Sequence, residues 1–222
     1  MSIVATKLAK LKVDLNRWGW HRSLFSHVAS FAARHLGIHI HVVRTCSLAA
    51  NPPYPTTLPD ITYRLIKAEE LVHASSDPDL GLRRDIVEAA IARGDFAFGA
   101  FDGSVLAAYV WRTLTSARHT DDVWVRVNKP YAYAYKSFTR SGYRGNRLMP
   151  SVLLFSDREM LKHGYTHRAG FVAIYNLPSL AAGKHMASKV IGYAGYLDLF
   201  GRYFPFRTQA VKNIGFEFFV NR

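Results

Sequence analysis

The segment spanning residues 131–161 constrains the fold most, because a strand, a glycine-containing turn and a helix follow one another in it without interruption. Tyr131, Tyr133 and Tyr135 alternate with alanines, and this period of two places all three rings on one face of a strand. Residues 140–146 contain two glycines and an asparagine, which tolerate positive φ angles and let several backbone N–H groups point into one concavity. The pattern predicts a strand up to residue 139 and a tight turn after it.

A helix is predicted directly after this turn. From about Arg147 apolar side chains recur at helical spacing, and Pro150 stands in the first turn, where its missing N–H costs nothing. Unpaired amides and the positive end of the helix dipole therefore converge at the turn, and Arg140, Arg144 and Arg147 add full charges there. These features predict a phosphate or pyrophosphate site. The alternative is an ordinary strand-to-helix connection with its arginines in solvent.

The charge of the chain indicates an anionic partner. The 222 residues suffice for one domain with an extension or two small domains, and their formal net charge is +13. Coenzyme phosphates, an acidic carrier protein, anionic lipid and nucleic acid would all suit this charge. We expect no nucleic acid, because the sequence lacks zinc-finger spacing, a helix-turn-helix pattern and an RNP-like aromatic signature.

Cys46 is the single cysteine, so no disulfide framework can form within one chain, which suits a reducing compartment. The sequence has no apolar run long enough to span a bilayer and no signal-peptide pattern. We therefore expect a cytoplasmic protein, with a peripheral position at the inner face of the membrane as the open variant.

The first 50 residues are predicted to form a basic helical arm followed by a strand. Apolar residues recur at helical spacing over residues 1–36 with a break at Gly19, and residues 37–48 alternate as a strand. The arm could lie on a membrane or pack on the domain or on another subunit as a homo-oligomer contact, and packing is favoured. His39 and His41 share a strand face, but no third ligand stands at metal spacing, so no metal is expected.

A proline-rich stretch at residues 51–60 is the predicted linker, and residues 61–222 form the predicted main domain. In that domain the pattern predicts a strand, two short helices, a hairpin across Asp102–Gly103, two further strands, the turn and its helix. An apolar strand at residues 169–175, a short helix opened by Asn176-Leu177-Pro178-Ser179 and late strands complete the order.

This order resembles the GNAT family of acyl-CoA-dependent N-acyltransferases over residues 61–206. The residues that match are Thr139-Arg140-Ser141-Gly142-Tyr143-Arg144-Gly145, for the pyrophosphate motif, and Asn176-Leu177-Pro178-Ser179 for a later motif. The resemblance implies an α/β (α+β) fold: a GNAT-like mixed central sheet flanked by helices, here with a helical N-terminal extension. It also implies acetyl-CoA or a longer acyl-CoA as co-substrate and an amine-bearing acceptor of unknown identity.

Carried over residue by residue, the resemblance implies a CoA-binding set made of Phe138, Thr139, Arg140, Arg144, Gly145, Asn146, Arg147, Leu148, Met149, Asn176 and Ser179. The chain departs from the family pattern at three places. Arg147 and Met149 stand where glycine or a small residue is usual, so their side chains must point away from the phosphates or crowd the site, with a direct contact of Arg147 to a phosphate as a further alternative. Gly183 stands where many members have a tyrosine that protonates the leaving thiolate, and Tyr133 stands where a glutamate is frequent.

The catalytic groups that the sequence offers are therefore alternatives. The candidates for the general base are Asp122, His119, Tyr133 and Tyr135, and those for the acid are Tyr175, His185 and Tyr193. A bulge near residues 138–140 is expected to splay the long strand from the next parallel strand, so that backbone amides can hold the acyl oxygen. Two readings compete with an acyl-CoA enzyme: an acyltransferase that uses an acyl carrier protein, and a non-catalytic CoA-binding or membrane-docking module.

Overall fold

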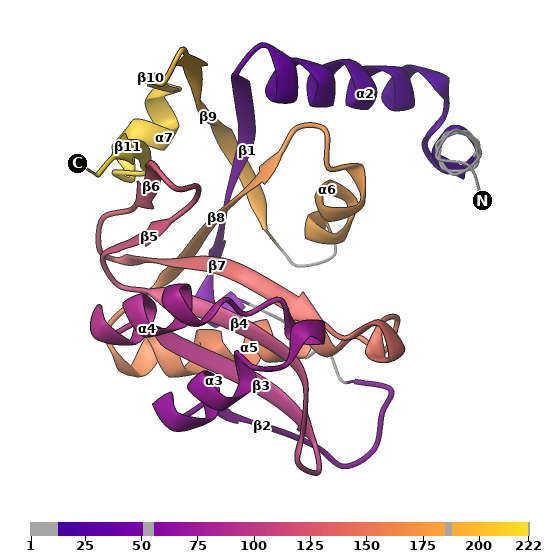
Figure 1. The fold of residues 1–222 in the computed structure, drawn as a ribbon, viewed down its shortest axis with the longest axis vertical. Helices are drawn as coiled ribbons and strands as arrows, with labels where there is room; N and C mark the ends of the chain where they lie inside the picture. The colour runs from indigo at the N-terminus through magenta and orange to yellow at the C-terminus, as the bar shows by residue number, and fades with distance from the viewer. Residues whose placement is uncertain (1–12, 51–55, 185–187, 222) are drawn as a thin grey trace.

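The computed structural model describes residues 13–50, 56–184 and 188–221. Within this part of the chain, eight strands form one mixed sheet (Figure 1). From one edge to the other their order is β10 (Arg202–Arg207), β9 (Lys189–Leu199), β1 (Ile38–Ser47), β8 (His167–Ala173), β7 (Tyr131–Thr139), β4 (Val105–Thr113), β3 (Phe96–Asp102) and β2 (Ile61–Leu65). A smaller sheet of the described residues contains β11 (Glu217–Val220), β6 (Val123–Arg126) and β5 (Ser116–Arg118).

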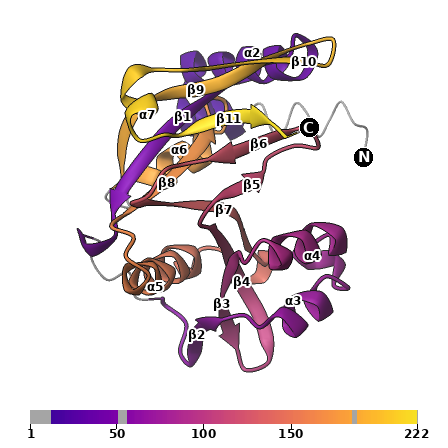
Figure 2. The ribbon, with the colours of Figure 1, turned by 90° about the vertical axis from the view of Figure 1, so that its left-hand side faces the viewer.

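Helices cover both faces of the large sheet, as the predicted α/β (α+β) class requires. Figure 2 shows α3 and α4 on one side of β2, β3 and β4, and α5 on the other side. The helices are α2 (Trp20–His35), α3 (Ala68–Ala74), α4 (Arg84–Ala92), α5 (Leu148–Lys162), α6 (Leu177–Lys184) and α7 (Gln209–Asn213), with short 3-10 turns η1 (Leu48–Ala50), η2 (Pro78–Leu80) and η3 (Ser141–Tyr143). None of the helices in the described ranges is long and apolar enough to cross a membrane.

β1 lies in the interior of the large sheet, although the sequence placed this segment in the arm, ahead of the linker. It pairs antiparallel with β8 on one side and with β9 on the other, so that Val43 faces both Phe171 and Gly192. The predicted division at residues 51–60 therefore does not separate β1 from the sheet of the main domain. The periodicity of residues 37–48 predicts a strand but cannot reveal which distant strands it joins. Removing residues 1–50 would remove an interior strand.

The helical arm breaks at the predicted glycine. Residues 13–18 are helical, Gly19 has a φ angle of 79°, and α2 begins at the next residue. The predicted packing of the apolar stripe on the domain is wrong for α2, because Trp20, Phe25 and Phe31 are 60%, 53% and 56% exposed. Packing against another subunit stays a prediction.

β7 and β8 are parallel neighbours for only three residue pairs, the last of which is Tyr133 with Ala169. Beyond that pair the two strands diverge, which is the predicted splay. The bulge that accompanies it is not near residues 138–140 but earlier: Ser137 pairs with Val110 while Tyr135 already pairs with Trp111, which leaves Lys136 as the extra residue. Lys136 has a φ angle of 39°, as the local kink requires.

A buried cluster of charges ties α5 to the strands on either side of β7. Asp157 of α5 accepts hydrogen bonds from Arg112 of β4 and Arg168 of β8. The side chains of Asp157 and Arg112 are fully buried, and Ser156 also accepts from Arg112 Nη2 at 2.7 Å. Burial lowers the pKa of Arg112 to about 10, and it remains protonated at neutral pH. A carboxylate shared by two arginines in this way is costly to remove, because both cations would stay buried.

We expect Asp157→Ala to lower the free energy of unfolding by about 3–5 kcal/mol, the range for breaking a buried ion pair from one side. Chemical denaturation followed by circular dichroism would measure this. Glu88→Ala is the matched control, because Glu88 pairs with Arg84 at 2.8 Å on the solvent side of α4. Its loss should change the free energy of unfolding by no more than about 0.5 kcal/mol. Equal effects of the two variants would contradict the assigned role of Asp157.

Candidate functional site

The turn between β7 and α5 presents a run of unpaired backbone amides. The N–H groups of residues 145–149 donate to no described residue, and the amide of Ser151 is the next one bonded, to the carbonyl of Arg147 at 3.2 Å. Gly145 and Arg147 have φ angles of 87° and 57°, which turn successive amides toward one side. Because α5 begins at Leu148, the positive end of its dipole lies at the same place. At the predicted anion site, the groups available to an anion are therefore mainly those of the backbone.

Arg140 and Arg144, two of the three arginines of this turn, differ in their surroundings. Arg140 forms an ion pair with Asp77, and its Nε donates to the carbonyl of Leu106 at 2.8 Å. A carboxylate thus already compensates the charge of Arg140. Arg144 is exposed and makes only an Nε bond to the Thr139 carbonyl, at 3.2 Å, among the described residues. Arg144 therefore has donors left for a phosphate, whereas Arg140 mainly anchors the turn.

Apart from Arg147, which is exposed at the turn, the side chains that could crowd the phosphates point elsewhere. Leu148 is buried in the core cluster under α5, and Met149 packs against the same cluster. Phe138 stacks on Tyr109 with ring centroids 5.7 Å apart, on the α4 side of the sheet. Asn146 accepts from Thr57 Oγ1 through its side chain at 2.9 Å. In the predicted CoA set, these residues contribute shape and backbone groups rather than side-chain contacts.

The divergence of β7 and β8 opens a cavity of about 350 Å³, here called the α5-side cavity. Gly170 and Val172 of β8, Ala134 of β7 and Leu153 of α5 are among its lining residues. Leu153 follows Leu148 by five residues, so the unpaired amides lie about 7 Å from it along the helix axis. The cavity and the anion site are therefore adjacent along α5.

A second cavity, of about 430 Å³, lies on the other side of the sheet between α4 and the small sheet; it is here called the α4-side cavity. Four residues line both cavities: Tyr133, Tyr135, Lys136 and Phe171. The two spaces therefore border the same residues at the gap between β7 and β8, which brings a group bound in one near a group bound in the other.

The candidate bases Tyr133 and Tyr135 line both cavities, but neither suits a general base. Burial raises the pKa of Tyr133, and burial together with the carboxylate of Asp95 raises the pKa of Tyr135. Neither phenol ionises near neutral pH. Tyr135 donates to Asp95 Oδ2 at 2.6 Å, and Arg93 donates to the same oxygen at 2.7 Å. The hydrogen bond from Tyr135 to Asp95 fixes the tyrosine ring where it lines the α4-side cavity.

Of the other base candidates, His119 lines the α4-side cavity and Asp122 does not. Burial, and then the charge of His39, lowers the pKa of His119 to about 4, so its imidazole is neutral near pH 7 and able to accept a proton. Asp122 instead accepts from the hydroxyl of Tyr203 at 3.0 Å at the surface.

His41 packs against His119, but the described residues contain no group of three side chains that could hold a metal ion.

The Asn-x-x-Ser segment opens α6. Asn176 Oδ1 accepts from the backbone N–H of Ser179 at 3.2 Å, and the Asn176 carbonyl accepts from Leu180 N–H at 3.0 Å. Both residues therefore shape the start of the helix. α6 leads to Gly183, the position where the resemblance implies a tyrosine.

Arg44 of β1 occupies the space beside Gly183. Its Nη2 donates to the Gly183 carbonyl at 3.0 Å, and its Nε donates to Ser188 Oγ at 2.9 Å. A Cβ atom on Gly183 would lie 3.0 Å from the guanidinium carbon, so a larger residue there would displace Arg44. Arg44 also lines the α5-side cavity, and burial lowers its pKa. Sequence analysis missed this residue because β1 is far away along the chain.

The structure describes two of the three predicted acids, and both lie apart from the two cavities. Tyr175 follows β8, and its carbonyl accepts from Ser26 Oγ at 2.7 Å. Tyr193 is 48% exposed on β9, and neither tyrosine lines the α5-side or α4-side cavity. His185 lies outside the described residues.

No protein-family model matches this chain, and no curated protein matches it in sequence. Solved structures do match. A tandem GNAT protein from the clavulanic acid biosynthesis pathway aligns over 87% of this chain with a TM-score of 0.50 and 16% identity. The chain has the GNAT fold. A GNAT-family acetyltransferase from Colwellia psychrerythraea aligns over 77% of the chain, with a TM-score of 0.48 and 15% identity.

This chain spans 58% of the length of the tandem GNAT protein and 56% of the Colwellia protein. At these identities the likeness shows the GNAT fold alone, and the activity has to be argued from the site. The predicted mixed sheet with its flanking helices is confirmed.

We expect Arg144→Ala to weaken CoA binding by about 1–3 kcal/mol, because a charge-assisted hydrogen bond to phosphate is lost. Isothermal titration calorimetry with CoA would measure the change in Kd. Arg84→Ala, which removes an exposed arginine from α4, is the control and should leave the Kd unchanged. An unaltered Kd for Arg144→Ala would remove this side chain from the site.

Proposed function

We propose that this chain transfers an acetyl or other acyl group from acyl-CoA to an amine. The observation that carries the proposal is the gap between β7 and β8, which joins the α5-side cavity, next to the unpaired amides, with the α4-side cavity. In this proposal the diphosphate binds the amides of residues 145–149, the thioester lies in the gap, and the amine approaches from the α4 side. Backbone groups that the splay leaves unpaired would hold the acyl oxygen.

The chemistry needs a proton acceptor for the amine and a stable leaving group. His119 lines the α4-side cavity and is neutral, so it can accept a hydrogen bond from the amine or from a bridging water, but its lowered pKa makes it a weak base. For the second, Arg44 places a cation beside Gly183, where it can stabilise the departing thiolate without donating a proton. Thiols ionise at about pH 8.5, so a CoA thiolate leaves near neutral pH without a dedicated acid.

Two other readings of the same fold remain to be separated from this one. An acidic acyl carrier protein would suit Arg144 and Arg147, which form no ion pair with a described residue, and a CoA-binding module without turnover would suit the absence of a side chain at Gly183. Calorimetry with CoA, followed by thiol release from acetyl-CoA across a panel of amines, distinguishes them. Binding with thiol release supports the proposal. Binding without release for any amine favours the module, and release only from acyl carrier protein favours the carrier.

We expect that Tyr175→Phe, Tyr193→Phe and His185→Ala each lower kcat by less than roughly 10²-fold, the low end for general acid catalysis. Arg44→Met should lower kcat by roughly 10- to 100-fold, the scale of a lost charge-assisted hydrogen bond, with CoA affinity retained. The dependence of kcat on the pKa of the leaving thiol should also steepen in Arg44→Met. A loss far above 10²-fold for one of the other three, with binding intact, would show that a dedicated acid exists.

The charges of the α4-side cavity favour an acceptor that also carries an anionic group. Four cations line it, Arg83, Arg93, Arg118 and Lys136, against one carboxylate, that of Asp121. Each of the three arginines pairs with a carboxylate at 2.6–2.7 Å. Lys136 makes no hydrogen bond or ion pair with a described residue, and burial lowers its pKa. A carboxylate or phosphate of the acceptor would compensate this charge.

We therefore expect amines that carry a carboxylate to be better acceptors than the same amines with an amide in its place, for example alanine against alaninamide. Lys136→Met should remove roughly a 10- to 100-fold preference in kcat/KM, whereas Lys136→Arg should retain it. Thiol release measures both. A preference that Lys136→Met leaves unchanged would show that the anion, if there is one, binds elsewhere.

A further inference from the structure

α2 turns its small residues toward the protein and its large apolar residues outward. Ser23 and Ala33 are 1% and 6% exposed, and Ser26 Oγ donates to the Tyr175 carbonyl. The outward residues form one stripe, here called the α2 apolar face: Trp20 (60% exposed), Leu24 (56%), Phe25 (53%), Val28 (58%) and Phe31 (56%). Side chains of this size that stay contiguous and in solvent mark an interaction surface.

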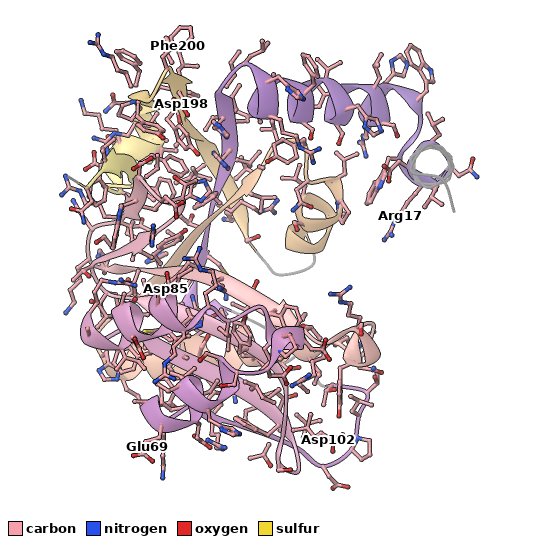
Figure 3. All side chains as sticks on the ribbon, viewed as in Figure 1. Arg17, Glu69, Asp85, Asp102, Asp198 and Phe200 are labelled. Carbon is pink, nitrogen blue, oxygen red and sulfur yellow. The ribbon has the colours of Figure 1, made fainter. Side chains whose placement is uncertain are left out.

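The turn between β9 and β10 reaches the same end of the molecule. Figures 1 and 2 both show α2 lying across this end, with the β9–β10 hairpin beside it. Phe200 at the hairpin turn is fully exposed, and Figure 3 shows it projecting from the same end. α2 and the Phe200 side chain, which lie at the same end of the molecule, can therefore contact one flat surface together.

A pocket of about 400 Å³ opens beside the α2 apolar face, between α2 and α6. Its apolar part includes Ile174, Leu177 and Leu180, and its α2 side includes His21 and Arg22. Arg22 is exposed and pairs with no carboxylate among the described residues. An apolar pocket with a cation at its mouth fits a ligand that has a hydrocarbon part and an anionic head.

The charge of α2 selects among the surfaces that could cover it. The chain contains no Asp or Glu from Leu15 to Pro59, and α2 carries Arg22 and Arg34. Two copies that met through α2 would bring two basic helices without carboxylates together, and like charges would oppose the contact. The phosphates of an anionic bilayer supply the opposite charge, and basic side chains flanking aromatic ones are typical of helices that lie in a membrane interface.

We propose that α2 and the β9–β10 turn dock this protein on the surface of an anionic membrane, the inner face of a cytoplasmic membrane being the natural one, with a lipid acyl chain entering the pocket between α2 and α6. The helix lies in the interface and does not cross it. The Ser26–Tyr175 bond connects α2 to the segment that follows β8, and residues of β8 line the α5-side cavity. The proposal is independent of acyl transfer.

Flotation of the full chain with vesicles tests this proposal. The chain should float with vesicles of phosphatidylcholine and phosphatidylglycerol and not with vesicles of phosphatidylcholine alone, and added salt should weaken the binding. Phe25→Glu combined with Phe31→Glu should abolish flotation, and Arg22→Glu combined with Arg34→Glu should weaken it at least tenfold. Leu161→Glu changes an apolar residue of α5 that is 38% exposed, and should float as the unaltered chain does.

The arginine variants change exposed side chains only, so they keep the test decisive if the phenylalanine variant does not fold; circular dichroism and CoA binding report folding. Absence of flotation with anionic vesicles would overturn the proposal, as would equal flotation with phosphatidylcholine alone. Sedimentation of the chain as a dimer that Phe25→Glu dissociates would also overturn it, because a second copy would then cover the α2 apolar face.

Discussion

The carboxylate of Asp157 holds together the part of the structure on which the candidate site depends. β7 lies between β4 and β8, and Asp157 binds an arginine from each of these outer strands. α5 therefore crosses one face of β7 and holds β4 and β8, the two neighbours of β7, at a set separation. The gap, the cavity within it and the amides at the start of α5 keep their relative positions because one buried acid fixes all three elements.

Around this clamp, the sheet consists of two halves with different geometry. On the β2–β4 side, neighbouring strands are antiparallel, and the bulge at Lys136 bends β7 away from β8 after their three parallel pairs. On the other side, β8, β1, β9 and β10 form a second antiparallel group. The site lies where the two groups meet, where backbone groups stay unpaired and both faces of the sheet are open to a ligand.

The local part of this arrangement is predictable from sequence, and the long-range part is not. The alternating tyrosines, the glycine turn and the helical spacing after Arg147 predicted β7, the turn and α5, because each signal lies within a few residues. The pairing of Arg140 with Asp77 and the position of Arg44 beside Gly183 depend on contacts between distant segments. The bulge was predicted a few residues too late, since β-branched and aromatic residues do not show which position is left unpaired. Lys136 therefore escaped notice as one of the residues that line both cavities.

The position of β1 between β8 and β9 also bears on how the chain can be made. β1 leaves the ribosome before either of its neighbours, and Val42, Val43 and Cys46 have no partner strand until β8 and β9 have been synthesised. Translation at about 5–20 residues per second leaves such a strand waiting for seconds. An apolar strand with two open edges is prone to pair with other chains during that time. A nascent chain of this kind therefore exposes an unpaired apolar strand until β9 emerges, and β1 cannot take its place in the sheet before most of the chain has been made.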